Sequence, residues 1–482
     1  YPYTELTARE LDDESNRVAR GLQQYGIGRG ARTVLMVTPS VEFFVLTFAL
    51  FKAGAVPVMV DPGMGVRHLK TCLDEAAPGA FIGIPKAHAA RVLLGWARSA
   101  KRLVTVGRRI FWGGATLAQV RSLDASPVMA ETGADEMAAI LFTSGSTGTP
   151  KGAVYTHGIF EAQVRALREH YRIEPGERDL ATFPLFALFG PALGMASIVP
   201  NMDASRPITA DPRNLAAAIK DYKTTNIFAS PALIDVLGRY GETATVRLDS
   251  VRRVISAGAP ADLESLERFA KLLPEGVEVF PSYGATEALP LCSIGSAELL
   301  STRVETESGK GICVGRPIRS VELAVIDITD DAIGTWSNDL RLPPGAIGEI
   351  CVQGQMVTRA YFNRDEATRH AKIPDGDAVW HRMGDVGYLD ATGRLWYCGR
   401  KGHRVELDHE TLYSIPVERV LDTHPKVRRT ALVGVDTPET MLPVLCVELR
   451  PEVDRSEWTA IRDELGAIAR SHDHTKRIET FL

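Results

Sequence analysis

The chain lacks a long uninterrupted hydrophobic run. Its two most apolar stretches are residues 41–60, which charged residues and a proline interrupt, and residues 185–199. The second stretch is shorter than the ~20 residues that a membrane-spanning helix needs. We therefore expect both to pack in a core and no part of the chain to span a membrane. Because residues 185–199 follow the strand-like segment 180–184, they are also a candidate lining for an acyl pocket.

Cysteine is scarce and scattered, and no C-x-x-C pair occurs. This pattern excludes a disulfide framework and a zinc ribbon, and it favours buried, reduced thiols in a cytoplasmic protein. No N-terminal signal pattern is visible. The six cysteines are Cys72, Cys292, Cys313, Cys351, Cys398 and Cys446.

Neither sign of charge dominates the composition. The chain has 60 acidic and 55 basic residues, a formal net charge of −5, so its overall charge gives no reason to expect nucleic acid as a partner. The histidines show no spacing typical of a zinc site, and the G-x-S-x-G elbow of serine hydrolases is absent. A length of 482 residues predicts two or three domains rather than one core.

The first hundred residues alternate between helical and strand patterns, which predicts parallel sheets covered by helices, an α/β fold. Gly26-x-Gly28-x-x-Ala31 fits a loose dinucleotide fingerprint. It lies after a helix and before a strand, the reverse of the required order, so we interpret it as a helix stop and turn. Helices are expected at 11–24, 41–52, 69–75 and 87–99, and strands at 33–37, 56–60 and 80–84.

Short strands with Gly/Pro turns dominate residues 324–397 and predict a β-rich subdomain of a large domain 1–400. Beyond Arg400, residues 401–482 are expected to form a small α+β domain. Its expected elements are a helix at 415–422, strands at 430–435 and 444–449, and a helix at 457–469.

One stretch of ten residues is rich in hydroxyls and glycines. It reads Thr143-Ser144-Gly145-Ser146-Thr147-Gly148-Thr149-Pro150-Lys151-Gly152 and follows the apolar segment 137–142, a predicted buried strand. Glycines let backbone N–H groups approach a ligand, hydroxyls donate hydrogen bonds and the lysine neutralises charge, so the stretch suits a polyphosphate. It is not a Walker loop, because no Gly-Lys-Ser/Thr stands at the required spacing.

The order of residues in this stretch resembles the phosphate loop T-S-G-S/T-T-G-x-P-K-G of the adenylate-forming superfamily, which includes acyl-CoA synthetases and luciferases. Further motifs of that superfamily follow in its order and span most of the chain. They are Ser256-Ala257-Gly258-Ala259-Pro260, Tyr283-Gly284-Ala285-Thr286-Glu287, Gly348-Glu349-Ile350 with Gly354 and Tyr361, Gly384-Asp385, and Gly399-Arg400. The resemblance implies a large N-terminal domain of mostly parallel sheets with a β-rich subdomain, followed by a small mobile C-terminal domain.

The resemblance also implies ATP and Mg²⁺ as cofactors and assigns roles to individual residues. The β- and γ-phosphates would be bound by the loop residues Thr143, Ser144, Gly145, Ser146, Thr147, Gly148 and Lys151. Mg²⁺ would be placed by Thr147 and Glu287, and the α-phosphate would be contacted by Thr286. The adenine would lie beside Gly258, Ala259 and Pro260, with Tyr283, together with Gly284 and Ala285, stacking on it, and the ribose hydroxyls would donate to Asp385, with Arg400 beside it. Lys151, Thr286, Glu287 and Arg400 are the expected catalytic residues.

Three departures from the superfamily bear on the second reaction step. Ala187 stands where many acyl-CoA synthetases have histidine, and His409-Glu410-Thr411 replaces a G-Y-R-type loop that helps admit pantetheine. The pivot between domains, usually Asp or Lys, is Gly402. These features resemble the β-lactone synthetase branch of bacterial long-chain olefin biosynthesis. That branch adenylates a long-chain β-hydroxy acid, whose own hydroxyl then closes a β-lactone and releases AMP.

Two alternatives stay open on the sequence. One is a long-chain fatty acyl-CoA or fatty acyl-AMP ligase; the other is a nucleotide-binding scaffold that has lost catalysis. The expected partners are a small-molecule long-chain acid and other enzymes of the olefin pathway in an assembly, with no nucleic acid. The superfamily's late adenylating lysine is expected beyond Leu482, since Lys476 is a poor substitute, and the natural N-terminus is expected upstream of Tyr1.

Overall fold

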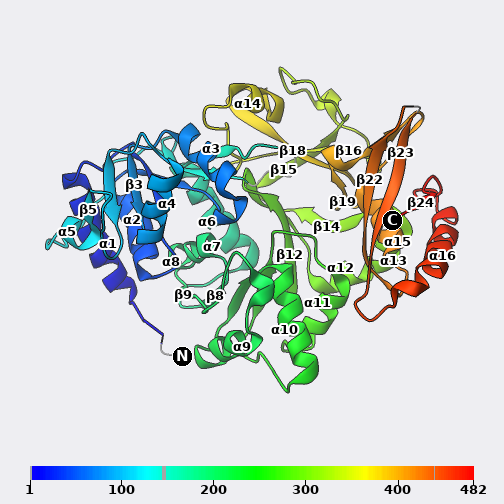
Figure 1. Ribbon diagram of the computed structural model, residues 1–482, viewed down its shortest axis with the longest axis horizontal. Helices are drawn as coiled ribbons and strands as arrows, with labels where there is room; N and C mark the ends of the chain where they lie inside the picture. The colour runs from blue at the N-terminus through cyan, green and yellow to red at the C-terminus, as the bar shows by residue number, and fades with distance from the viewer. Residues whose placement is uncertain (1–2, 144–147, 439) are drawn as a thin grey trace. The chain divides into compact units, whose positions relative to one another are not determined.

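The computed structural model describes residues 3–143, 148–438 and 440–482 (Figure 1). The chain forms two compact units. The first comprises Tyr1–Phe228, Thr286–Leu289 and Gln355–Arg369; the second comprises Ala229–Ala285, Pro290–Gly354 and His370–Leu482. The polypeptide therefore passes between the units inside the Y-G-A-T-E motif, after Ala285.

The first unit begins with a seven-stranded sheet in the order β5-β4-β3-β1-β2-β6-β7. Its strands are β1 (Arg32–Met36), β2 (Val56–Met59), β3 (Ala80–Gly83), β4 (Arg102–Thr105), β5 (Ala115–Thr116), β6 (Met137–Phe142) and β7 (Gly152–Thr156). All neighbours are parallel except β6 and β7. Residues of β2 and β3 are buried throughout, as expected of strands that helices cover on both faces.

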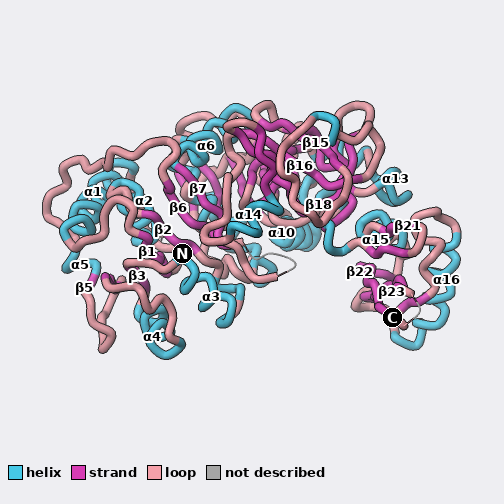
Figure 2. The backbone as a smooth tube through the Cα atoms, turned by 90° about the horizontal axis from the view of Figure 1, so that it is seen from above, coloured by secondary structure: helices cyan, strands magenta, loops and turns pink. Residues whose placement is uncertain are grey.

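Helices cover this sheet and build two separate apolar cores. The helices are α1 (Ala8–Gln24), α2 (Val41–Lys52), α3 (Val66–Ala76), α4 (Pro85–Leu94), α5 (Leu117–Val120) and α6 (His157–Tyr171). One core holds residues of α1 and α2, such as Leu22 and Leu46; the other holds residues of α3 and α4, such as Leu73 and Ala87. Figure 2 shows α4 beside β3 at the lower margin of the view. The predicted α/β alternation is confirmed.

Local interactions explain why two helices begin or end at residues other than the predicted ones. The first helix starts at Ala8 rather than 11, because Thr7 forms a capping box with Glu10. The helix predicted at 87–99 ends at Leu94, because Gly95 adopts a left-handed conformation with φ of 66°. After α1 the chain turns at Gly26, with φ of 89°, and so confirms that the loose dinucleotide fingerprint is a helix stop.

The apolar stretch 185–199 lies in the first unit as short elements. They are α7 (Pro184–Ala187), α8 (Phe189–Leu193) and β9 (Ala196–Ile198). Strand β9 pairs in parallel with β8 (Arg178–Ala181), and β8 pairs in parallel with β10 (Asn226–Ala229). Between β9 and β10 in the sequence stands helix α9 (Pro212–Asp221). Ala187 and Leu193 are buried, so the prediction of core packing is confirmed. Within the described residues, no helix is both long and apolar enough to cross a membrane.

The second unit contains a mostly antiparallel sheet whose strands follow the order β15-β16-β18-β19-β14-β13-β12-β11. Its strands are β11 (Arg253–Ser256), β12 (Val279–Ala285), β13 (Ala288–Ser293), β14 (Ile312–Pro317), β15 (Val321–Ile326), β16 (Gly348–Gly354), β17 (Lys372–Asp375), which pairs with β18 (Ala378–Leu389), and β19 (Leu395–Arg400). Its helices are α10 (Pro231–Thr243), α11 (Leu263–Ala270), α12 (Ser296–Ser301) and α13 (Arg303–Glu305). Helix α14 (Asp365–Ala371) begins in the first unit, whose last segment ends at Arg369. The β-rich character expected from residue 324 onward is confirmed.

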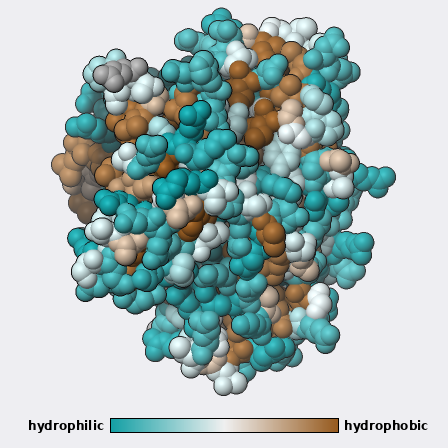
Figure 3. All heavy atoms as spheres, turned by 90° about the vertical axis from the view of Figure 1, so that its right-hand side faces the viewer, coloured by the Kyte–Doolittle hydropathy of each residue, from teal (hydrophilic) through white to brown (hydrophobic). Residues whose placement is uncertain are grey.

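The C-terminal part of the second unit forms its own apolar core. Its elements are β20 (Val405–Leu407), β21 (Glu410–Leu412), α15 (Ser414–Leu421), β22 (Val427–Asp436), β23 (Met441–Leu449), α16 (Trp458–Arg470) and β24 (Thr480–Phe481). Val417, Leu445 and Leu465 are among the buried residues of that core. The face that carries α16 is mostly hydrophilic, with separate hydrophobic patches (Figure 3). The predicted α+β elements are present, whereas the domain boundary after Arg400 stays a prediction.

Candidate active site

The predicted phosphate loop connects β6 to β7 in the first unit. Phe142 pairs with Gly152 across these antiparallel strands, and the Thr143 N–H donates to the Lys151 carbonyl at 3.0 Å. A side chain at Gly152 would place Cβ 2.8 Å from a methyl of Ile140, so glycine is required there. The loop is thus pinned at its base. Ser144, Gly145, Ser146 and Thr147 lie outside the described residues.

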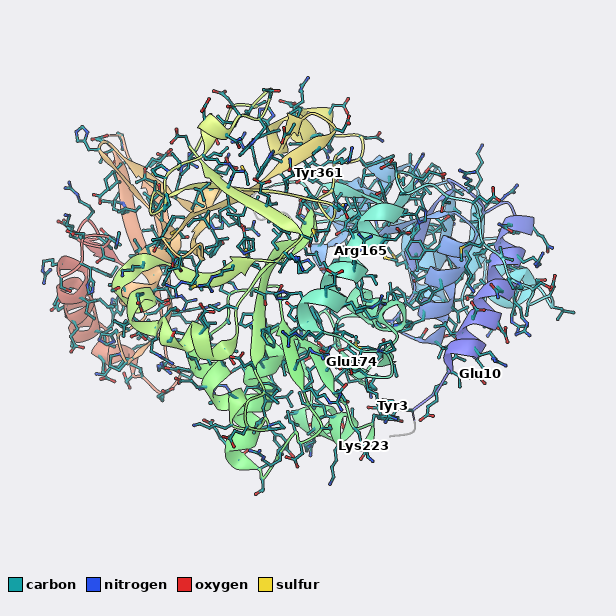
Figure 4. All side chains as sticks on the ribbon, turned by 180° about the vertical axis from the view of Figure 1, so that it is seen from behind. Tyr3, Glu10, Arg165, Glu174, Lys223 and Tyr361 are labelled. Carbon is teal, nitrogen blue, oxygen red and sulfur yellow. The ribbon has the colours of Figure 1, made fainter. Side chains whose placement is uncertain are left out.

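Lys151, Tyr361 and Glu287 come together in the first unit, although they are far apart in the sequence. The Lys151 ammonium lies 5.1 Å from the centroid of the Tyr361 ring, and the Tyr361 hydroxyl donates to Glu287 Oε1 at 2.8 Å. Burial and the Glu287 carboxylate raise the pKa of Tyr361, which stays a neutral donor. Figure 4 labels Tyr361, which stands in the stretch of sequence after β16 and before α14. Sequence motifs marked this tyrosine but gave it no role.

Hydrogen bonds to backbone carbonyls fix the turn from Thr286 to Glu287. The Thr286 carbonyl accepts from the hydroxyl of Tyr155, and the Glu287 carbonyl accepts from both the N–H and the hydroxyl of Thr358, at 2.8 and 3.0 Å. Tyr155 is buried, and burial raises its pKa. With the carbonyls fixed, the Glu287 carboxylate is placed by the fold. Tyr155 and Thr358 carry no motif and could not have been found from the sequence.

A second cluster, in the second unit, joins Asp385 to Tyr283 and Arg400. The Tyr283 hydroxyl donates to Asp385 Oδ2 at 2.6 Å, and Arg400 Nη1 lies 2.9 Å from Asp385 Oδ1. Asp385 and Arg400 are also paired across β18 and β19. Burial and the adjacent Asp385 carboxylate raise the pKa of Tyr283 well above its usual value. The predicted pairing of Asp385 with Arg400 is confirmed, and Tyr283 has a polar contact that the sequence did not indicate.

The segment predicted to lie beside adenine follows β11. Gly258 has φ of 103°, in the range that favours glycine, and Gly258, Ala259 and Pro260 are all exposed. Gly284 and Ala285 end β12. The contacts of these residues with a nucleotide stay predictions.

A buried ion pair lies next to the predicted ribose motif in the second unit. Arg382 Nη2 is 2.6 Å from Glu349 Oε2, and both side chains are 2% exposed. Lys401 Nζ is 3.5 Å from the same carboxylate oxygen. The guanidinium of Arg382 also donates to the carbonyls of Asp331 and His370, at 2.7 and 3.1 Å. Glu349, from the G-E-I motif, therefore neutralises two cations.

The described residues hold no group of three or more His, Cys, Asp and Glu side chains placed to bind a metal ion. All six cysteines are free, and the prediction that they are buried is confirmed for five of them but wrong for Cys446, which is exposed. Carboxylate oxygen is the ligand type that Mg²⁺ prefers, and Glu287 presents such an oxygen beside Lys151 and Tyr361. The chemistry of Glu287 thus fits the predicted Mg²⁺, while Thr147, the other predicted ligand, lies outside the described residues.

The family model of AMP-binding enzymes matches residues 1–362. The chain belongs to the AMP-binding enzyme family. Its curated relatives include two olefin β-lactone synthetases. The protein from Xanthomonas campestris pv. campestris is 52% identical over 99% of this chain and 86% of the relative, and the one from Stenotrophomonas maltophilia is 50% identical over 99% and 87%.

Solved structures resemble this AMP-binding enzyme over nearly its whole length. The amide bond synthetase McbA from Marinactinospora thermotolerans superposes with a TM-score of 0.82 at 24% identity, covering 99% of this chain and 91% of that protein. O-succinylbenzoate coenzyme A synthetase from Bacillus subtilis, in complex with AMP, gives 0.78 at 22% identity, with 100% and 90% covered. At these identities the likeness confirms the fold, including the small C-terminal α+β part.

Removing the loop lysine should affect ATP use and leave folding intact. Lys151 is partly exposed, and its contact with the Tyr361 ring contributes only about 0.5–1 kcal/mol. A charged hydrogen bond to phosphate is worth more, so Lys151→Ala should weaken apparent ATP affinity about 10- to 100-fold. Initial rates against ATP concentration and a thermal melt measure both effects. A melting temperature many degrees lower, with normal ATP kinetics, would assign Lys151 a structural role.

Proposed function

We propose that this AMP-binding enzyme uses ATP to convert a long-chain β-hydroxy acid into a β-lactone, releasing AMP and pyrophosphate. The observation that carries the assignment is identity of 52% and 50%, over 99% of the chain, to two olefin β-lactone synthetases. Other relatives, such as feruloyl-CoA synthase from Amycolatopsis, are 28% identical over 90% of the chain. The enzyme is an AMP-forming ligase of the adenylate-forming class.

In the first step, a carboxylate oxygen of the substrate attacks the α-phosphorus of ATP. The bond from that phosphorus to the bridging oxygen breaks, pyrophosphate leaves, and an acyl-adenylate forms. Charge gathers on the phosphoryl oxygens, so positioning and cations supply most of the rate enhancement. We assign Lys151 and its loop to the β- and γ-phosphates, Thr286 to the α-phosphate, and Asp385 with Arg400 to the ribose. Mg²⁺, with Glu287 and Thr147 as ligands, would neutralise phosphate charge.

In the second step, the substrate's β-hydroxyl oxygen attacks the acyl carbon. The carbonyl carbon releases AMP as the ring closes, and the hydroxyl proton passes to solvent, so the product equals the acid minus one water. An internal nucleophile reaches effective molarities of about 10⁵ M or more, which offsets part of the ring strain. No second substrate needs to enter.

Two features of the structure support closure without coenzyme A. His409-Glu410-Thr411, in place of the G-Y-R-type loop, lies in the hairpin of β20 and β21, where Glu410 is 3.4 Å from Arg477. At Ala187 no polar side chain is present, and the adjacent Phe186 ring stacks on Phe228 with centroids 4.0 Å apart. An apolar wall of this kind suits a hydrocarbon chain. We also propose that the enzyme works in the cytoplasm and assembles with other enzymes of its pathway.

Product analysis separates lactone formation from thioester formation. With a long-chain β-hydroxy acid, ATP and Mg²⁺ but no coenzyme A, the products should be AMP, pyrophosphate and a species lighter than the acid by one water. A plain fatty acid of equal length has no internal nucleophile, so at most it should be adenylated and stall. Mass spectrometry and an AMP assay measure both outcomes.

Addition of coenzyme A is the control for this experiment. It should change the rate for neither acid. Efficient thioester formation from plain fatty acids would overturn the lactone assignment and favour the acyl-CoA ligase alternative, while pyrophosphate exchange without product would favour an acyl-AMP ligase. Absence of any exchange would leave only a nucleotide-binding scaffold.

A further inference from the structure

One long segment of the first unit contains no carboxylate. Between Ala76 and Leu123 the sequence has neither Asp nor Glu, although the whole chain has 60 of them and a net charge of −5. The same segment carries eight basic residues, namely Lys86, Arg91, Arg98, Lys101, Arg102, Arg108, Arg109 and Arg121. The segment is therefore strongly cationic in an acidic protein.

Most of this positive charge faces solvent without a counter-ion. Arg121 pairs with Glu14, but within the described residues none of the other seven forms an ion pair. Six of those seven are exposed; the exception is Arg91, which packs over the ring of Phe81 at 5.8 Å. A cationic surface without internal counter-ions attracts an anionic one over the Debye length of about 10 Å at 0.1 M salt.

Large apolar side chains are exposed among these cations. Ile110 and Phe111, on the loop after β4, are 62% and 67% exposed, and Leu93 on α4 is 79% exposed. Its neighbours Val92 and Leu94 are exposed as well. Exposed aromatic and aliphatic side chains beside Lys and Arg are typical of proteins that bind at a membrane surface.

The loop and the helix form one surface because Trp112 joins them. The Trp112 ring stacks on His88 of α4, with centroids 5.4 Å apart and planes 6° apart, and its Nε1 donates to Thr105 Oγ1 at 2.9 Å. The adjacent Phe111 ring lies 5.2 Å from that of Trp112. Burying Trp112 therefore holds Ile110 and Phe111 outward beside α4, which Figure 2 shows at the margin of the fold.

We propose that this surface, α4 and the loop 106–114, docks on an anionic lipid bilayer. On α4 and this loop the exposed basic residues are Lys86, Arg108 and Arg109. They would contact lipid phosphates, and each basic residue near such a membrane strengthens binding about fivefold. Ile110, Phe111 and Leu93 would enter the boundary between headgroups and acyl chains. A protein partner would also accept an apolar surface, but the uninterrupted positive charge favours phosphate-rich lipid. Docking does not depend on the reaction that the enzyme catalyses.

The chain offers a matched control for a charge-and-apolar double variant. Arg108 and Ile110 stand two residues apart, as do Arg206 and Ile208, and the two isoleucines are 62% and 64% exposed. Arg108→Glu/Ile110→Ser and Arg206→Glu/Ile208→Ser thus change the same charge and the same apolar area on different surfaces. None of these residues belongs to the proposed ATP or substrate sites.

Co-sedimentation with vesicles tests the proposal on the full chain. Wild type should bind phosphatidylglycerol/phosphatidylcholine vesicles but not pure phosphatidylcholine vesicles, and binding should fall as NaCl rises. Arg108→Glu/Ile110→Ser should weaken binding at least about tenfold, because it reverses one charge and removes one apolar anchor. The control variant should bind within about twofold of wild type.

Three outcomes would overturn docking on lipid. In the first, the wild type binds anionic and neutral vesicles equally. In the second, both double variants lose the same amount of vesicle binding. In the third, the wild type does not bind vesicles but associates with itself or with another protein, and Arg108→Glu/Ile110→Ser abolishes that association. Thermal melts check that the variants are folded. Pyrophosphate exchange with a water-soluble acid should be equal in all three proteins, which keeps a failure of docking distinct from a failure of the proposed function.

Discussion

Glu287→Gln should lower the rate of adenylation by about 100-fold or more. The change keeps the size of the side chain, and its amide oxygen can still accept from the Tyr361 hydroxyl, which lies 2.8 Å from Glu287 Oε1 in the wild type. The backbone at this turn is held by Thr358 and by Tyr155, which the change does not touch. The expected loss of adenylation rate is therefore caused by removal of the negative charge, whose role we assign to binding Mg²⁺. Pyrophosphate exchange at several Mg²⁺ concentrations measures it.

Two observations make this result specific. Excess Mg²⁺ should restore the Glu287→Gln variant only partly, because an amide oxygen is a weaker ligand than a carboxylate. Tyr361→Phe removes the hydrogen bond but leaves the charge, so it should cost less than Glu287→Gln and chiefly raise the Mg²⁺ concentration required. Wild-type exchange in Glu287→Gln at ordinary Mg²⁺ would contradict the assignment of this carboxylate.

Glu349→Gln should destabilise the second unit by about 3–5 kcal/mol. Glu349 is 2% exposed, lies 2.6 Å from Arg382 and is also 3.5 Å from Lys401. Removing its charge leaves the buried Arg382 guanidinium without its paired carboxylate and beside the like charge of Lys401. The remaining nearby carboxylate, Asp330, is 78% exposed and pairs with Lys401 at 3.2 Å, so solvent screens its effect. Carbonyl acceptors around Arg382 satisfy its N–H groups but do not neutralise it. Thermal unfolding followed by circular dichroism should show a melting temperature several degrees lower.

Glu322→Gln is the matched control for this prediction. Glu322 lies on β15, next to β16 in the same sheet, and its partner is Arg341. With 58% of the Glu322 side chain exposed, solvent screens the pair, and its loss should cost at most about 1 kcal/mol. Equal melting temperatures for Glu322→Gln and Glu349→Gln would show that burial of the Glu349–Arg382 pair does not matter to stability.

Much of the fold follows from local patterns. The helix 41–52 and the strand 137–142 were predicted with the observed bounds, because each is a mostly apolar segment with clear ends, the helix beginning after the N-cap Ser40. The helix expected to reach residue 99 ends at Leu94, since a glycine that adopts positive φ overrides the helical pattern. Residues 229–285, which contain the SAGAP motif and the start of the YGATE motif, belong to the second unit, whereas Thr286–Leu289 belong to the first. No local signal in the sequence reports this exchange of chain between the units.

The motifs by themselves point to the nucleotide-binding residues, because a bound nucleotide requires the same hydroxyls, glycines and charges in many proteins. The motifs give the adenylate-forming class and predict the phosphate loop with Lys151, the acid at Glu287 and the ribose residues Asp385 and Arg400. The tertiary structure decided which groups support these residues. Tyr361 reaches Glu287 across 74 positions, and Tyr155 reaches Thr286 across 131. Such contacts depend on strand order and side-chain direction, which packing of the whole core fixes and spacing along the chain does not encode.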